Sequence, residues 1–145
     1  PAQISLLLAQ VPLLSKMDLN ERMRLASLME EKSFFDGEPI VRIGEPGDCM
    51  YIVEMGTLAV TKSDSGTAVV KTLLEGDYFG EVALMKEGDS RRLATVTASS
   101  QCRLLKISKE TFDGILLNKK AQKEVRRRIV DYSKGNAKNW YVGVL

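Results

Sequence analysis

The sequence predicts an α+β fold in which helices at both ends flank an antiparallel β sandwich or barrel. Two patterns indicate this fold. Residues 1–31 and 108–134 repeat apolar side chains at helical spacing, whereas residues 32–107 alternate short β-rich runs with Gly-rich turns about every 8 to 12 residues. Residues 135–145 form a tail, and a chain of 145 residues is long enough for one functional domain with its own core.

The N-terminal segment is expected to be helical as far as residue 31. Asp18 and Glu21 have the spacing of a capping box, in which the two side chains satisfy free backbone amides at the helix start. Pro12 separates this helix from a shorter one around residues 4–10. One side of this helix is expected to face the core. Its central stripe consists of Leu19, Met23, Ala26 and Glu30. The apolar face is widened by Leu25, Leu28 and Met29.

The middle segment changes to the pattern of strands. Its turns fall at Gly-containing residues 44–48, 55–56, 63–66 and 75–77. The strands expected between and after these turns are 39–43, 50–54, 58–61, 67–74, 93–98 and 103–107.

The C-terminal segment returns to helical spacing. Ser108 can cap a helix that runs to Leu117, with Phe112, Ile115 and Leu116 on one face. A basic helix is expected over residues 119–132 and ends at Gly135 and Asn136. Its basic side chains are expected to form a solvated or protein-binding face, not a nucleic-acid site.

The composition excludes most catalytic classes. The chain has no histidine, so it has no imidazole base and no His-ligated metal, which argues against a cupin-like iron or manganese enzyme. Two cysteines and a net charge of +2 predict neither a disulfide framework nor a strongly basic protein, and no apolar run approaches the length of a membrane span. We expect a cytoplasmic, reducing compartment, no cofactor and no membrane insertion.

One stretch carries binding chemistry. Gly80 allows close backbone approach before a short helical turn at residues 81–85, and free amides at a helix start favour an anion. Arg92 can give a forked, charge-assisted pair of hydrogen bonds to a phosphate, while Glu81 can accept from a sugar hydroxyl. These groups describe a nucleotide pocket without a metal or a general base.

The sequence FGEVAL at residues 79–84, followed by RLATV at residues 92–96, resembles the phosphate-binding cassette of the cyclic nucleotide-binding domain family. Residues 11–14, 36–38, 44–48, 51–52 and 56–57 are similar to the family's members in regulatory subunits of cAMP-dependent protein kinase, in particular to their C-terminal nucleotide domain. The resemblance implies an eight-stranded antiparallel β-roll of jelly-roll type, flanked by N-terminal helices and by C-terminal B and C helices.

The resemblance also implies roles for single residues. Glu81 binds the ribose 2′-hydroxyl, Arg92 binds an exocyclic phosphate oxygen, and amides around Ala83 and Ala94 complete the phosphate cradle. Tyr132 is expected to cap the base by stacking. The complete set of expected ligand-binding residues is Phe79, Gly80, Glu81, Val82, Ala83, Arg91, Arg92, Leu93, Ala94, Thr95 and Tyr132.

Two departures from the family pattern leave the ligand open. The spacing of 11 positions from Glu81 to Arg92 is longer than in kinase-regulatory members, and Arg91 stands where a proline usually precedes the arginine. The longer loop brings Glu87 and Asp89 near the expected phosphate, and a carboxylate about 4 Å from a phosphate costs about 1–4 kcal/mol. Either the loop turns these carboxylates outward and Arg91 compensates, or the pocket prefers a neutral nucleoside.

By resemblance, the chain is a regulatory, non-enzymatic module. It binds a cyclic nucleotide and controls a protein kinase, in trans or in the same chain, through movement of its C-terminal helices. cAMP is favoured over cGMP because Leu93 has no hydroxyl for the guanine amino group. The alternatives are a nucleoside-responsive kinase regulator with the same pocket, or the corresponding domain of a cGMP-dependent kinase, an ion channel or an exchange factor.

Overall fold

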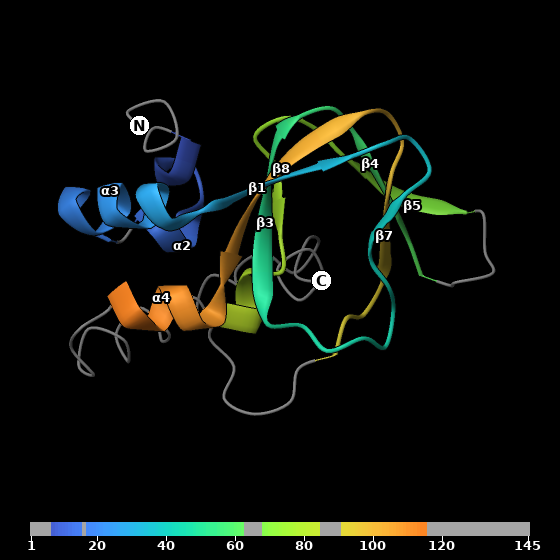
Figure 1. The fold of residues 1–145 in the computed structure, drawn as a ribbon. Helices are drawn as coiled ribbons and strands as arrows, with labels where there is room; N and C mark the ends of the chain where they lie inside the picture. Colours follow the sequence, from blue (N-terminus) through green and yellow to red (C-terminus); the bar gives the residue numbers. More distant parts are fainter. Residues whose placement is uncertain (1–6, 16, 63–67, 85–90, 116–145) are drawn as a thin grey trace.

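The computed structural model describes residues 7–15, 17–62, 68–84 and 91–115. Eight strands form two antiparallel four-stranded sheets, and helices cover one side of the resulting β-roll (Figure 1). This architecture confirms the predicted fold class.

The first sheet has the order β1-β8-β3-β6 and the second has the order β2-β7-β4-β5. The strands of the first sheet are β1 (Glu30–Phe34), β8 (Cys102–Ser108), β3 (Cys49–Met55) and β6 (Tyr78–Phe79). Those of the second sheet are β2 (Pro39–Val41), β7 (Thr95–Ala98), β4 (Leu58–Thr61) and β5 (Val69–Leu73). Some strands that are neighbours in a sheet are distant in the sequence. The pairing of β3 with β8, for example, joins the two halves of the middle segment.

The helical elements with bounds in the described residues are α2 (Pro12–Ser15), α3 (Leu19–Leu28), the 3₁₀ turn η1 (Glu81–Leu84) and α4 (Lys109–Ile115). The capping box is confirmed, since the Asp18 carboxylate accepts from the Glu21 amide at 2.8 Å and the Glu21 carboxylate accepts from the Asp18 amide at 3.0 Å. The predicted Ser108 cap is also present, because its hydroxyl accepts from the Thr111 amide at 3.1 Å.

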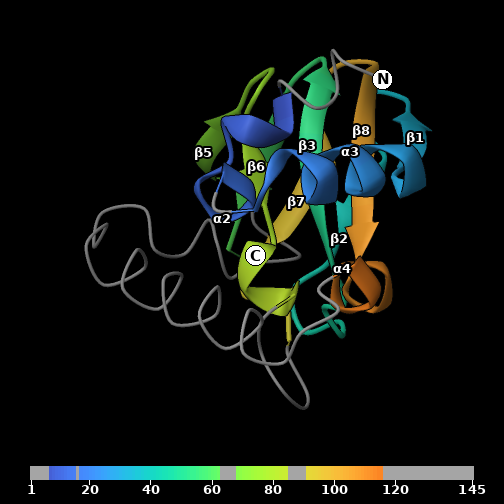
Figure 2. The same ribbon diagram turned by 90° about the vertical axis from the view of Figure 1, so that its left-hand side faces the viewer.

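The core has two parts on opposite faces of the first sheet. Inside the roll, side chains of both sheets pack together, among them Tyr51, Val60, Phe79, Val96 and Leu104. On the outer face, side chains of β3 and β8 meet α3 and α4, which Figure 2 shows lying against that sheet. Because both faces of β3 are covered, its residues Cys49–Val53 are all buried without alternation.

The packed face of α3 differs from the predicted stripe. Leu25 and Ala26 are buried, whereas Leu19, Met23 and Leu28 remain more than half exposed. The prediction was wrong for these three because only one narrow side of the helix faces the sheet and α4.

Two strands fall outside the predicted runs. β1 begins at Glu30, within the segment expected to be helical, and is rich in charged residues because it forms the edge of its sheet. β6 has only two residues and overlaps the start of the cassette motif, so it was not predicted as a strand. The division of the chain at residue 31 stays a prediction.

Candidate functional site

The candidate site begins where β6 ends. Gly80 follows Phe79 directly and has φ of +83°, a conformation that favours glycine. A Cβ at this position would lie 2.6 Å from Arg92 Nη1 and 2.8 Å from the Cys49 carbonyl oxygen, so the glycine is also required by space. The chain then turns into η1, as the cassette motif predicted.

Arg92 is buried behind this glycine, with only 3% of its surface exposed. Its Nη2 donates to the Cys49 carbonyl oxygen at 2.8 Å and to the Cys49 Sγ at 3.3 Å. Gly47 lies against the same side chain, since a Cβ there would be 3.0 Å from Arg92 Nε. The guanidinium is therefore held between the backbones of two glycines, 47 and 80.

The turn at residues 44–48 holds the backbone of Arg92 in place. The Arg92 amide donates to the Glu45 carbonyl oxygen at 2.8 Å, and the Gly44 amide donates to the Arg92 carbonyl oxygen at 2.8 Å. Nearby, the Thr95 hydroxyl accepts from the Ile43 amide at 3.0 Å. These bonds link two segments that lie far apart in the sequence and fix where the arginine enters the roll.

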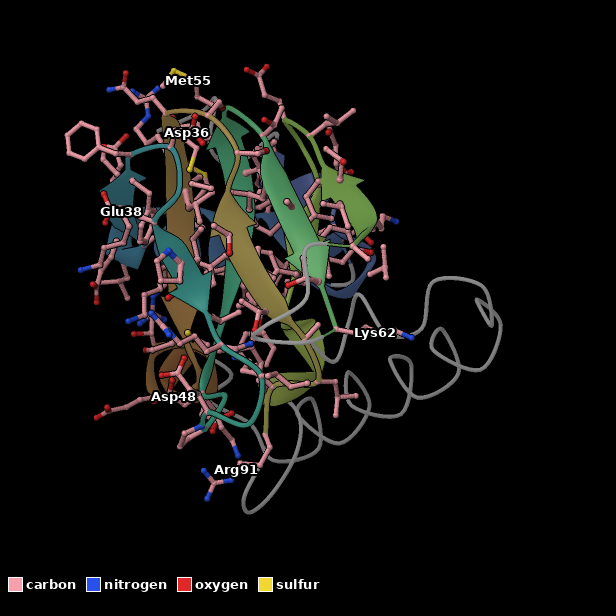
Figure 3. All side chains as sticks on the ribbon, turned by 90° about the vertical axis from the view of Figure 1, so that its right-hand side faces the viewer. Asp36, Glu38, Asp48, Met55, Lys62 and Arg91 are labelled. Atoms are coloured by element: carbon pink, nitrogen blue, oxygen red, sulfur yellow. The ribbon has the colours of Figure 1, made fainter. Side chains whose placement is uncertain are left out.

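Arg91 has the opposite orientation. Its side chain is exposed and projects outward at the end of the roll that also carries Asp48, away from the end with Asp36 and Met55 (Figure 3). Its Nη1 donates a hydrogen bond to the Gly44 carbonyl oxygen at 3.3 Å. Of the two adjacent arginines, Arg92 is therefore the one directed into the cassette.

An aromatic pair lies next to Cys49. Tyr51 stacks on Phe79 with ring centroids 5.2 Å apart. The pKa of the Tyr51 hydroxyl is raised above its ordinary value, mainly because the group is buried and further because it lies beside Cys49. Cys49, Tyr51 and Phe79 thus form a continuous set of buried contacts leading from Arg92 into the roll.

Other predicted residues divide into three groups. Ala83, Ala94 and Thr95 are buried around the cassette, and the Ala83 amide donates to the Gly80 carbonyl oxygen at 3.0 Å. Leu93, beside the buried arginine, is 47% exposed. The side chains of Glu81, Val82, Glu87, Asp89 and Tyr132 lie outside the described residues.

Two residues of the site were missed by sequence reasoning. Cys49 is absent from the expected ligand-binding residues, and Gly47 was predicted only as part of the turn at residues 44–48. The sequence offered one indication, the similarity of residues 44–48 to members of the family. This similarity indicated that the turn belongs to the family pattern, but not that its backbone encloses Arg92.

The arrangement suits an anion. A buried guanidinium is costly to desolvate, and an anion placed against it recovers part of that cost through charge-assisted hydrogen bonds. Among residues 7–15, 17–62, 68–84 and 91–115, no cluster of His, Cys, Asp and Glu side chains could hold a metal ion.

A sequence profile described as the cyclic nucleotide-binding domain matches residues 31–119, which include the whole cassette. The chain belongs to the cyclic nucleotide-binding domain family. Two curated relatives bear the name cAMP-dependent protein kinase regulatory subunit: that of Yarrowia lipolytica is 40% identical over 109 residues, and that of Dictyostelium discoideum is 40% identical over 113 residues. These matches cover 75% and 74% of this chain but only 28% and 34% of the relatives, so the chain spans about a third of their length or less.

Solved structures of the family have the same fold. The regulatory domain of Toxoplasma gondii PKA, crystallised with cAMP, superimposes with a TM-score of 0.69 and 34% identity, covering 90% of this chain and 50% of that one. A cyclic nucleotide-binding-like protein of Brucella abortus gives a TM-score of 0.72 and 26% identity, covering 80% of this chain and 99% of that one. The domain is thus a regulatory ligand-binding module and not a catalytic one. Within the described residues, no helix has the length and apolarity needed to span a membrane.

Proposed function

We propose that this domain binds cAMP and thereby controls a protein kinase through movement of its C-terminal helices. The observation that carries the proposal is Arg92, buried between Gly47 and Gly80 at the start of the cassette. A guanidinium held in this way suits the exocyclic phosphate of a cyclic nucleotide. The regulatory subunits of cAMP-dependent protein kinase among the relatives support both the ligand and the kinase partner.

Within this proposal, Arg92 favours a phosphate-bearing ligand over a nucleoside. Leu93 favours cAMP over cGMP because an exposed leucine beside the cassette offers no hydroxyl to the guanine amino group. Glu81 is assigned the ribose 2′-hydroxyl and Tyr132 the base, as the resemblance implies. Glu87 and Asp89 motivate the alternative of a neutral nucleoside, which the experiment below distinguishes.

The core supports a route from the ligand to the helices. Leu84, the last residue of η1, is fully buried in the outer core together with Leu14 and with Phe112 of α4. A shift of η1 on ligand binding therefore changes the packing under α4, and only a difference in ligand affinity between the two arrangements can drive this change. The kinase catalytic domain that responds, in trans or in the same chain, is expected to be cytoplasmic.

The experiment compares Arg92→Lys with Arg91→Lys, a matched control for the exposed neighbour. Calorimetric titrations with cAMP, cGMP, adenosine and inosine are made on each protein. Since a hydrogen bond to a charged group contributes about 1.5–3 kcal/mol, Arg92→Lys should weaken cAMP binding about 10- to 100-fold, and Arg91→Lys should change it little. Unchanged cAMP affinity in Arg92→Lys would refute the phosphate assignment, and tighter wild-type binding of adenosine than of cAMP would favour the nucleoside regulator.

A further inference from the structure

Cys49 makes two contacts with the guanidinium of Arg92. It is the first residue of β3 and is 4% exposed. Its carbonyl oxygen and its Sγ lie 2.8 Å and 3.3 Å from the same nitrogen, Nη2. One residue therefore supplies that nitrogen with a backbone acceptor and a side-chain acceptor.

The two acceptors differ in what fixes them. The backbone of Cys49 is held by pairing with Ser108 of β8, so its carbonyl oxygen keeps its place whatever side chain the residue has. The Sγ depends on the side chain alone. The Sγ gives Nη2 a second acceptor, which lies in a different direction from the carbonyl oxygen. Two acceptors restrain rotation of the Arg92 guanidinium more than one does.

The groups around Arg92 leave rotation of the guanidinium as the main motion that could change its orientation. Gly47 lies close to Nε, Cδ and Cζ of Arg92, and Gly80 lies close to Nη1. Sideways displacement is therefore blocked by two backbones, while rotation would carry Nη1 away from the glycine that opens the cassette. Two positions along β3 from Cys49, Tyr51 is buried and stacks on Phe79 with ring centroids 5.2 Å apart.

We propose that the Cys49 side chain is a positioning residue that orients Arg92 toward the phosphate of the ligand. This inference rests on the proposed function for its effect on affinity. The thiol does not touch the ligand and acts only through the guanidinium. Its removal should consequently affect ligands that carry a phosphate and spare those that do not.

The test compares Cys49→Ala, which removes the acceptor, with Cys49→Ser, which restores one. Cys102→Ala is the matched control, since Cys102 is 1% exposed and belongs to the same inner core but is not bonded to Arg92 in the described contacts. Because a hydrogen bond contributes about 0.5–1.5 kcal/mol, Cys49→Ala should weaken cAMP binding about 2- to 10-fold and leave adenosine binding unchanged. Cys49→Ser should bind cAMP within about twofold of the wild type, as should Cys102→Ala.

Several results would overturn the proposal. Equal weakening of cAMP and adenosine would assign Cys49 a general structural role. No weakening in Cys49→Ala, or the same weakening in Cys49→Ser, would remove the thiol as an acceptor.

A second measurement on the protein without ligand separates this inference from the proposed function. Side-chain NMR of Arg92 should detect slow rotation of the guanidinium in the wild type and in Cys49→Ser, and faster rotation in Cys49→Ala. Identical Arg92 signals in all three proteins overturn the inference whatever the ligand is. The expected NMR pattern in a wild-type protein that does not bind cAMP would support the positioning role and refute the proposed function alone.

Discussion

Replacing Gly80 with alanine tests the most crowded point of the site. The residue has φ of +83°, and an L side chain in this region costs about 1–2 kcal/mol. The added Cβ would also lie 2.6 Å from Arg92 Nη1 and 2.8 Å from the Cys49 carbonyl oxygen. Overpacking of this kind costs a further 1–3 kcal/mol or so, which gives a total loss of about 2–5 kcal/mol in the free energy of unfolding.

Two other glycines separate these contributions. Gly37 has φ of +91° and nothing within 4 Å of a Cβ, so Gly37→Ala should lose only the conformational part, about 1–2 kcal/mol. Gly56 has φ of +93° and would place a Cβ 2.6 Å from that of Cys102, at the other end of β3. Gly56→Ala should thus destabilise the fold about as much as Gly80→Ala without disturbing Arg92.

The assay is urea unfolding of the three variants, followed by cAMP calorimetry under conditions where each is folded. Gly80→Ala should weaken cAMP binding about tenfold or more, because Arg92 must move, and Gly56→Ala should leave it nearly unchanged. If Gly80→Ala lost no more stability than Gly37→Ala, the close contact inferred at Gly80 would be wrong. Equal affinity losses in Gly80→Ala and Gly56→Ala would show that affinity follows stability and not the position of Arg92.

Two further predictions concern the core. Leu25→Ala should lower the free energy of unfolding, measured in urea, by about 2–5 kcal/mol because Leu25 is fully buried. Met23→Ala, at a half-exposed position of the same helix, should stay within about 0.5 kcal/mol of the wild type. Similar losses of stability in the two variants would contradict the observed buried face of α3. Because the folded-state pKa of Tyr51 is raised above the ordinary 10.0, the unfolded chain ionises first, and the stability present below about pH 10 falls as the pH rises past it. The loss of stability between about pH 9 and pH 11 should therefore be smaller in Tyr51→Phe than in the wild type, and identical losses would mean that Tyr51 is not the group responsible.

Local sequence patterns predicted the elements whose stabilising contacts are close in the chain. The capping box of Asp18 and Glu21 requires only three residues of separation, and Ser108 caps α4 in the same way. The strand at residues 58–61 was predicted with its observed bounds because turn residues flank it on both sides, and in the structure its inner residues alternate with outer ones. Such patterns did not identify β1, because an exposed edge strand can be almost entirely polar.

The face of a helix that is buried depends on its neighbours in space. Leu19, Met23 and Leu25 have similar hydrophobicity, but only Leu25 points toward the sheet and α4. Periodicity indicates that an apolar face exists. It does not fix how wide the buried face is, because that width depends on the elements that pack against the helix, here the first sheet and α4.

The sequence by itself predicted an α+β domain, because periodicity and turn spacing are properties of the linear chain, and its residues 79–84 and 92–96 resemble the family's phosphate-binding cassette. It also placed two arginines, 91 and 92, beside the expected phosphate, and it assigned the phosphate oxygen to Arg92 only by resemblance. Only the tertiary structure decided that Arg92 is buried against Cys49, 43 residues away, while Arg91 faces outward. The physical reason is that a guanidinium can be buried only where acceptors meet its N–H groups and the surrounding backbone leaves room for it. Here the acceptor comes from β3 and the room from Gly47 and Gly80, which the chain brings together only by folding.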